Sequence, residues 1–596
     1  MKLNKKSDKN QKIVGSLRRA QVISTFGPGS IVDFPNYSVM ISGIDFWNYY
    51  DKEENYTIYE ENLQKQLGVK YFLQPKIDEK TNNQYGDKTK DIVSFIFPQT
   101  FICKKCGKID RYKKFKGKNK IYCNCGAEGK NIIPSRFVVA CEKGHIDDFP
   151  YEWWVHRSNK DCDKSNIKMK IDKSSDGLEG IIIYCDTCKS KRSMKGVFAK
   201  EALRGIRCRG KRPWLKDDVN CDETLKTLQR GATNLYYGVH ESALSIPPWS
   251  NRVNQIISKV KYWSMLKKKA KNEETLKQAI EFFELDKECR CSTEEIAQYV
   301  KRKIDYENTD KSIQREEIRQ DEYRSLCLGK YEEDDLHFCI EETDIEDEVR
   351  KYIDKVVLVK RLREVQSLIG FYRITPSSDD NEKEVTPIFK EKQEWYPAIE
   401  LKGEGIFIKL NEDKLKEWES KTSVLNRFNK IKNHMENSYL KKPNISPRYI
   451  LLHTLSHIII RQLTLDSGYS SSSIKERIYS TFTNGQAQNP IDMCGILIYT
   501  ASPDSEGSLG GLVDCGTKER FTNILLKALE ESTWCSSDPL CIESNGQGIS
   551  NLNLGACHSC CLLPETSCEM RNSYLDRGLL IGNLNDNSMA YFDDIY

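Results

Sequence analysis

Four cysteines near the C-terminal end of the chain have the spacing of a metal site. Cys557 and Cys560 form a CxxC pair, which Cys541 precedes and Cys568 follows. Thiolates at turn-like spacing are common ligands of Zn²⁺. We therefore predict a zinc site made by Cys541, Cys557, Cys560 and Cys568. Cys535 is an alternative to Cys541 as the first ligand.

A second group of cysteines lies in the basic front third of the chain. Cys103 and Cys106 form a CxxC pair, and Cys123 and Cys125 follow as a CxC pair before Gly126. Two such close pairs can form facing turns that wrap one tetrahedral Zn²⁺, with backbone N–H groups pointing at the sulfur atoms. We predict a structural zinc ribbon with these four ligands.

A third group has one close pair and two dispersed partners. Cys185 and Cys188 form a CxxC pair, and Cys208 and Cys221 lie farther along the chain. The single tight pair still has metal-ligand spacing. We predict that these four cysteines form a second zinc site of the front third.

Two further motifs include histidine. Cys141 and His145 lie between the two ribbon groups and could replace a ribbon ligand, although we favour a packed cysteine and a turn histidine. His453 and His457 are four residues apart in a predicted helix, so both rings project from one face. A zincin also needs glutamate directly after the first histidine, and this chain has Thr454 there. We therefore interpret this pair as part of a helix packed at a domain or partner surface.

The predicted metal sites indicate a structural role. Zinc binding in small sites supplies about 10–16 kcal/mol, as much as the whole stability of a typical domain, about 5–15 kcal/mol. All-cysteine sites are closed, whereas catalytic zinc keeps an open position and favours histidine or carboxylate ligands. The sequence also contains no GxxxxGKS or GxxxxGKT phosphate loop and no GxSxG nucleophile motif. We therefore expect a chain that is not an enzyme.

The composition is typical of a globular protein with strongly hydrated, polar surfaces. The 596 residues include 22 cysteines, charged residues make up 30% of the chain, and the mean hydropathy is −0.62. No run approaches about 18 apolar residues and the N-terminus is polar, so we expect no membrane span, no secretory signal and a cytoplasmic protein. In that compartment, so many cysteines favour metal thiolates over disulfides.

Charge is distributed unevenly along the chain. Residues 101–130 are rich in lysine and arginine, whereas residues 331–350 are strongly acidic. A basic front suits a protein that meets a polyanion with one face, although two solvated surfaces would give the same pattern. If the polyanion is DNA, we expect ribbon cations to contact its phosphates. The candidates are Lys113, Lys114, Arg207, Arg209 and Arg212.

The pattern of elements predicts a multidomain α+β protein. Zinc-ribbon modules occupy the N-terminal third, charged helices the middle, and an α/β region with the four-cysteine zinc site the C-terminal part. We expect helices over 448–465 and 520–531, strands over 405–410 and 495–499, and helical structure from about 250 to 365, including 349–365. The predicted domains span 1–100, 101–225, 226–375 and 390–596.

Several segments together resemble a known family, the DrmB-type proteins, which are a core component of the DISARM anti-phage defence system. The segments that carry this likeness are 18–33, 136–150, 453–457, 468–471 and 557–577. The C-terminal third also resembles the zinc-binding domain of MrfA-type DNA-repair helicases. It departs from that pattern by an insertion between Pro503 and Gly510.

The resemblance implies a division of labour between two chains. A DrmB-type protein works with a separate helicase chain, DrmA, which would hold the ATP-binding motor. We expect a non-catalytic, zinc-stabilised partner of a DrmA-like helicase that helps engage DNA, either a duplex with a single-stranded end or non-self phage DNA. The alternative is a pure protein scaffold for the helicase that never contacts DNA. A metal-dependent nuclease or hydrolase is a third hypothesis.

Overall fold

The computed structural model describes most of the chain between residues 14 and 595, and the chain divides into two compact units. Unit 1 comprises Met1–Ile58, Tyr71–Glu241 and Ser367–Ile399, and unit 2 comprises Tyr59–Lys70, Ser242–Gln366 and Glu400–Tyr596. Parts of the basic stretch, of the acidic stretch and of the insertion after residue 502 lie outside the described residues. The residues left out are 1–13, 36, 48, 50–52, 77–91, 116, 118–120, 158–161, 163–165, 173, 248–251, 309–310, 332–336, 378–382, 439–444, 482–490, 503–509 and 596.

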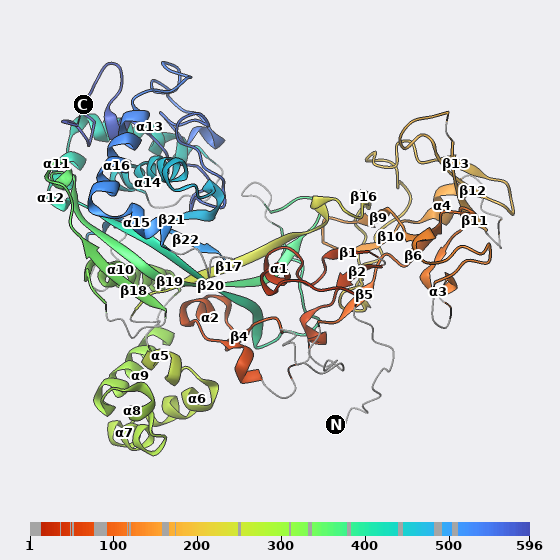
Figure 1. The fold of residues 1–596 in the computed structure, drawn as a ribbon, viewed down its shortest axis with the longest axis horizontal. Coiled ribbons are helices and arrows are strands. Elements are labelled where there is room, and N and C mark those ends of the chain that lie inside the picture. Colours follow the sequence, from red (N-terminus) through yellow and green to blue (C-terminus); the bar gives the residue numbers. More distant parts are fainter. Residues whose placement is uncertain are drawn as a thin grey trace. The chain divides into compact units, whose positions relative to one another are not determined.

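Unit 1 is built mainly from short strands in small antiparallel sheets (Figure 1). Cysteines lie in several of the turns that adjoin these strands. The sheet orders are β1–β2–β5, β7–β6–β8, β10–β9–β16, β11–β12–β13 and β14–β15. The bounds are β1 Ile31–Phe34, β2 Tyr37–Ile41, β5 Ser94–Ile96, β6 Thr100–Cys103, β7 Ile109–Arg111, β8 Ile132–Pro134, β9 Phe137–Ala140, β10 Ile146–Asp148, β11 Ile167–Ile171, β12 Ile181–Cys185, β13 Lys191–Ser193, β14 Lys211–Arg212, β15 Asp217–Asp218 and β16 Lys226–Gln229. Two helices of this unit, α3 (Tyr112–Phe115) and α4 (Tyr151–His156), adjoin the cysteine turns.

A buried arginine joins several loops of unit 1. The guanidinium of Arg373 donates to the carbonyl oxygen of Gly29 at 2.6 Å and to that of Gly144 at 2.8 Å. It also donates to the carbonyl oxygen of Leu235. Gly29 has φ of +88°, and a Cβ there would lie 2.6 Å from the Phe371 ring, so this turn requires glycine. Loops distant in the sequence are thus held at one charged centre.

A large, mostly antiparallel sheet dominates unit 2. Its strand order is β17–β19–β20–β22–β21, and β18 pairs with residues 356–362 of β19. The bounds are β17 Tyr237–Ser245, β18 Phe338–Thr343, β19 Ile353–Tyr372, β20 Trp395–Leu410, β21 Ile474–Ser480 and β22 Cys494–Ser502. The predicted strands at 405–410 and 495–499 are confirmed as parts of β20 and β22.

The helix α14 (Pro447–Ser467) forms the centre of the core of unit 2. It packs on β21 and β22, and α16 (Lys518–Ser532) packs on α14 (Figure 1). Residues 448–460 are buried on every side, so this helix has no polar face. Ser446 caps its N-terminus, and Gly468 ends it at φ of +72°. The predicted helices over 448–465 and 520–531 are confirmed.

A group of charged helices precedes the long strands of unit 2. Helices α5 to α9 pack on one another around Ile257, Leu276 and Ile296 (Figure 1). The bounds are α5 Arg252–Ile257, α6 Val260–Lys269, α7 Glu273–Phe282, α8 Leu285–Cys289, α9 Thr293–Asn308 and α10 Lys311–Cys327. The predicted helical middle is therefore confirmed from residue 252 to residue 327.

The predicted helix over 349–365 is wrong, because β19 begins at Ile353. The run Val356–Val359 is buried on both faces of the sheet. A continuous apolar run has the same pattern in a buried strand and in a buried helix, and only its β-branched residues favour the strand. Two charged residues near this run, Arg363 and Glu364, are also buried.

The remaining α-helices and strands adjoin the elements described above. They are α1 Arg19–Ser24, α2 Glu61–Leu67, β3 Thr57–Ile58, β4 Tyr71–Leu73, α11 Asp347–Arg350, α12 Glu412–Glu419, α13 Thr422–Glu436, α15 Gly511–Cys515 and α17 Gly578–Ile581. Among the described residues, no helix is long and apolar enough to cross a membrane.

Candidate metal centres

Five groups of potential metal ligands come together in the described part of the chain. In each group, one ligand atom from every side chain lies within 4.8 Å of the others. Every cysteine predicted as a ligand belongs to one of these groups. The structure, however, divides some of them differently from the prediction.

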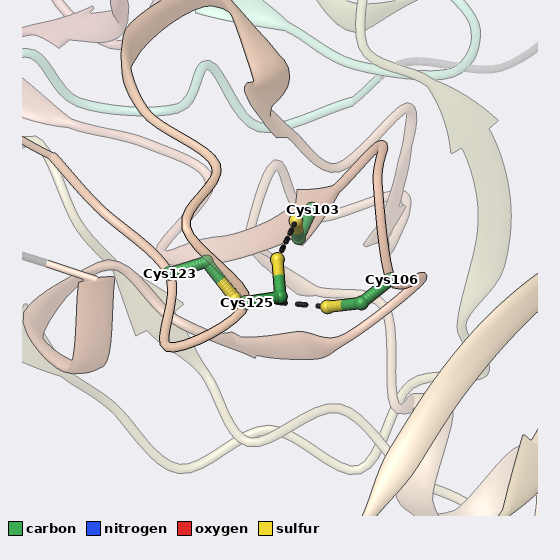
Figure 2. Close-up of side chains that lie close together, drawn as sticks. All are labelled: Cys103, Cys106, Cys123 and Cys125. Carbon is green, nitrogen blue, oxygen red and sulfur yellow. Dashed lines mark hydrogen bonds between the residues drawn. The ribbon is translucent and has the colours of Figure 1, made fainter.

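The first cluster contains the four predicted ribbon ligands, Cys103, Cys106, Cys123 and Cys125 (Figure 2). The Sγ atoms of Cys103 and Cys125 are 3.5 Å apart, and those of Cys106 and Cys123 are 3.6 Å apart. Sulfur atoms arranged tetrahedrally at about 2.3 Å from Zn²⁺ are separated by about 3.8 Å. The four sulfur atoms are therefore spaced for one zinc ion.

Two tight turns direct these sulfur atoms to one point. Gly107 and Gly126 follow the second cysteine of each pair, with φ of +73° and +81°, where glycine is free of steric cost. Each glycine N–H donates to the carbonyl oxygen of the first cysteine of its pair, at 2.8 and 2.9 Å. The backbone N–H of Ala127 lowers the pKa of the Cys125 thiol to about 7. This N–H group thus favours the thiolate of Cys125, which is the form that binds metal.

The second cluster contains Cys141, His145, Cys208 and Cys221. Cys141 and His145 flank the turn between β9 and β10. The His145 Nδ1 atom lies 3.4 Å from the Cys141 Sγ atom and 3.7 Å from the Cys208 Sγ atom. The strand β16, which follows Cys221, pairs with β9, which ends just before Cys141. Cys141 and His145 are therefore candidate ligands, and the interpretation of an isolated packed cysteine and turn histidine is corrected.

The third cluster contains the predicted CxxC pair, Cys185 and Cys188, together with His156 and Cys162. The prediction that this pair shares one site with the dispersed cysteines of the second cluster is therefore corrected. His156 ends α4, where its Nδ1–H donates to the Glu152 carbonyl oxygen at 2.9 Å and leaves Nε2 to face a metal. The pairing of β11 with β12 brings the segment that precedes β11 back to Cys185. The Sγ atoms of Cys162 and Cys185 are 3.8 Å apart.

The fourth cluster lies in unit 2 and includes both alternatives for its first ligand. Cys535 and Cys541 join Cys557 and Cys560. The Sγ separations are 3.5 Å for Cys535 and Cys557, 3.8 Å for Cys541 and Cys560, and 3.7 Å within the CxxC pair. The backbone N–H of Ser537 donates to the Cys535 sulfur at 3.4 Å. These separations again match a zinc ion held by four sulfur atoms.

Cys568, which was predicted as a ligand of this four-cysteine site, lies instead in a fifth cluster with His453, His457 and Glu476. A CxxC pair supplies two ligands through local turn geometry, but the other two come from segments that only tertiary packing brings close. Cysteines lie on both sides of this pair in the sequence, and spacing alone did not discriminate between them. The histidine pair, which we had interpreted as a packing feature, contributes both rings to the fifth cluster.

The cations predicted to contact DNA differ in their surroundings. Lys113 and Lys114 lie in α3 with exposed side chains, and no described residue pairs with either of them. Arg209 and Arg212 each form an ion pair with an aspartate at 2.6 Å. Arg207 is exposed and lies 3.9 Å from an exposed aspartate. Lys113 and Lys114 are therefore the candidates with the fewest internal contacts.

Two family models match parts of the chain. A model described as Domain of unknown function (DUF8724) matches residues 18–237, and the model of the MrfA Zn-binding domain matches residues 455–561. The second range includes all four cysteines of the fourth cluster. The chain thus has a zinc-binding domain of the MrfA type, and its four-cysteine cluster suits zinc as the cofactor.

The chain also resembles a curated protein over almost its whole length. The "DISARM protein DrmB" of Bacillus paralicheniformis is 31% identical over 587 residues. The match covers 94% of this chain and 99% of that protein. The match therefore spans both units, and the chain belongs to the DrmB family of the DISARM defence system.

Proposed function

We propose that this chain is a non-catalytic, zinc-stabilised subunit of an anti-phage defence complex in the cytoplasm, where it partners a separate DrmA-like helicase and helps engage foreign DNA. The observation that carries the proposal is the nearly full-length similarity to a DISARM protein. The sequence contains no GxxxxGKS or GxxxxGKT phosphate loop, so ATP-driven movement would belong to the helicase chain.

The ligand sets of the first four clusters support a structural role for the metals. The first and fourth clusters consist of cysteine alone, and the second and third combine three cysteines with one histidine. Four protein ligands complete a tetrahedral zinc and leave no open position for a substrate or an activated water. Zinc, when bound, would supply the crosslink that fixes these turns. We therefore propose that the metals of these clusters stabilise the shape of binding surfaces and take no part in a reaction.

Lys113 and Lys114 support a DNA contact beside the first cluster. Their helix, α3, directly follows β7, and β7 pairs with β6, which carries Cys103 at its end. The zinc turn thus fixes the position from which both exposed ammonium groups reach solvent. Arg209 and Arg212 are held by their aspartate partners. We place the principal phosphate contacts at the two lysines.

The experiment is a double charge reversal, Lys113→Glu with Lys114→Glu, in the assembled complex. Each lost phosphate contact should flatten the slope of log binding constant against log salt by about 0.9 for duplex DNA. Lys268→Glu with Lys269→Glu, at the exposed end of α6, changes the net charge equally and should leave the slope unchanged. An unaltered slope in the first variant would remove these lysines from the DNA contact.

Exposed apolar side chains beside the fourth cluster support a protein partner. Trp534 and Leu540, each directly before a ligand cysteine, are 70% and 84% exposed. Exposed apolar groups that lie close together are typical of interaction sites. We place the helicase contact there. Trp534→Ser with Leu540→Ser should abolish copurification of the helicase chain without loss of zinc, whereas Phe282→Ser, which alters a side chain in α7 that is 80% exposed, should not.

The scaffold hypothesis is the second candidate, and the ion pairs of Arg209 and Arg212 favour it, since paired guanidinium groups are poorly available to phosphate. Photocrosslinking of DNA to the assembled complex discriminates between the two. Adducts on this chain that disappear after reversal of Lys113 and Lys114 support a DNA contact. Adducts confined to the helicase chain support the scaffold.

A further inference from the structure

The fifth cluster consists of four side chains from three distant parts of unit 2. His453 and His457 lie in α14, Glu476 lies in β21, and Cys568 follows the CxxC pair of the fourth cluster. The Nε2 atoms of His453 and His457 lie 3.0 and 3.6 Å from the same Oε1 atom of Glu476. The Cys568 Sγ atom lies 3.1 Å from the His453 Nε2 atom. All four side chains are buried, and both histidines are completely so.

Hydrogen bonds outside the cluster orient both imidazole rings. The His453 Nδ1–H donates to the carbonyl oxygen of Tyr574 at 3.3 Å, and the His457 Nδ1–H donates to that of Cys561 at 2.9 Å. A backbone carbonyl accepts only from a protonated nitrogen, so these contacts assign the N–H to Nδ1 in each ring. The Nε2 lone pairs therefore point at the centre of the cluster. Metal-ligating histidines are oriented in this way by their second nitrogen.

The two remaining side chains are also held as ligands would be. One carboxylate oxygen of Glu476 accepts from the backbone N–H of Glu569 at 3.1 Å, and the other accepts from the Ser456 hydroxyl. The Cys568 sulfur accepts from the N–H groups two and four residues later, at 3.3 and 3.2 Å. Backbone N–H groups that converge on sulfur also occur in the turns of the four-cysteine clusters and favour a thiolate.

The atoms that converge at this centre are all acceptors: two imidazole nitrogens, one carboxylate oxygen and one thiolate. The His457 Nε2 atom has no hydrogen-bond partner among the described residues. Acceptors crowded together in a dry interior are unfavourable unless a cation joins them. A divalent ion would balance the formal charge of the carboxylate and the thiolate.

We propose that His453, His457, Glu476 and Cys568 form a buried, closed metal site that takes a divalent transition ion, with zinc the best match to this mixed ligand set. Tetrahedral zinc accepts imidazole, carboxylate and thiolate ligands. The site joins α14 and β21 to the segment that follows the fourth cluster, so its role is to lock the core of unit 2. Two histidines with this spacing also occur in zincin hydrolases. Here four protein ligands would leave no place for a reacting water, so the site would not be catalytic.

Metal content of the purified, full-length wild-type chain is the first test. Mass spectrometry of the bound elements should find five divalent ions per chain and not the four that the other clusters account for. After exchange into cadmium, ¹¹³Cd resonance spectra should show one signal in the range of mixed nitrogen, oxygen and sulfur ligation, apart from the sulfur-rich signals. A count of four ions per chain, with cadmium signals of sulfur-rich ligation only, would overturn the proposal. It would indicate that hydrogen bonds, and not a metal ion, join the four side chains.

Matched cysteine variants supply the second test. Cys568→Ser should lose one ion per chain together with the mixed-ligand cadmium signal. Cys515→Ser removes a thiol that is equally buried but lies outside all five clusters, and it should keep both. Retention of the fifth ion and its signal in Cys568→Ser would contradict the assignment. The wild-type count needs no variant to fold, and neither test depends on whether the chain contacts DNA.

Discussion

The metal clusters of the two units lie in different surroundings. In unit 1 they stand among short strands, and the apolar core at the first cluster is small, built from residues such as Phe101, Phe115 and Ile132. In unit 2 the clusters border a large core around α14, which includes Leu455 and Ile459. Short segments whose cysteines lie in tight turns bury too little apolar surface to fold without metal. A metal in the first cluster would therefore replace a core, whereas metals in unit 2 would reinforce an existing one.

The largest expected effect separates these two roles. Cys103→Ser with Cys106→Ser should remove a metal that contributes about 10 kcal/mol or more and should unfold the turns and strands around the first cluster. Cys557→Ser with Cys560→Ser should disorder its own loop but leave α14 and β22 protected. Hydrogen exchange followed by mass spectrometry measures both. Equal loss of protection throughout each unit would contradict the difference between a metal that replaces a core and one that reinforces it.

The second effect concerns the core of unit 2 itself. The Arg427 guanidinium donates to both carboxylate oxygens of Asp576 at 2.7 and 3.0 Å, and both side chains are buried. Arg427→Ala leaves a buried carboxylate without its partner and should lower the unfolding free energy by about 3–5 kcal/mol. Urea unfolding of the metal-loaded protein measures the loss. Arg520→Ala, which removes a half-exposed partner of Asp514, should cost less than about 1 kcal/mol and serves as the control.

A third effect is a pH dependence of unit 2. Burial raises the pKa of Glu60 from 4.5 to about 7, although Arg363 and the Ser245 hydroxyl oppose the shift. Arg363 also pairs with Glu400, which leaves less of its charge for Glu60. The folded state therefore binds the Glu60 proton more tightly than the unfolded state does. The contribution of this neutral carboxyl to stability is complete below pH 4.5 and is lost as the pH rises to about 7.

Glu60→Gln should remove this dependence. The difference in unfolding free energy between variant and wild type should favour the variant by up to about 3 kcal/mol at pH 8 relative to pH 4.5. Urea titrations of the two proteins at these pH values, with zinc present throughout, measure the change. A difference that stays constant with pH would show that Glu60 is ionised in the folded protein.

The smallest effect is expected at the surface of unit 1. Lys195 and Glu179 form an exposed ion pair at 2.9 Å. Lys195→Ala should change the unfolding free energy by less than about 0.5 kcal/mol, because exposed pairs are strongly solvated. Thermal unfolding with zinc bound tests this. A large loss would indicate that surface pairs, and not metals, sustain unit 1.

The helix α14 could be predicted from the sequence, whereas the strand β19 could not. The helix α14 has a long apolar run between Ser446 and Gly468, which are local start and stop signals. The strand β19 contains the apolar run Val356–Val359, which fits a buried strand as well as a buried helix. The ion pairs of its charged residues form only in the folded protein. Glu364 of β19, for example, pairs with Lys475 of β21 at 2.8 Å.

The sequence by itself determined which cysteines form pairs with metal-ligand spacing. A CxxC or CxC turn, such as Cys103 to Cys106, orients two sulfur atoms through a few backbone dihedrals, so neighbouring residues suffice. Only the tertiary structure decided which side chains lie close enough to share an ion. Strand pairing placed Cys221 beside Cys141, and packing against α14 placed Cys568 with two histidines and a glutamate. Those ligands are far apart in the chain, and their meeting depends on strand register and core packing, which no local spacing encodes.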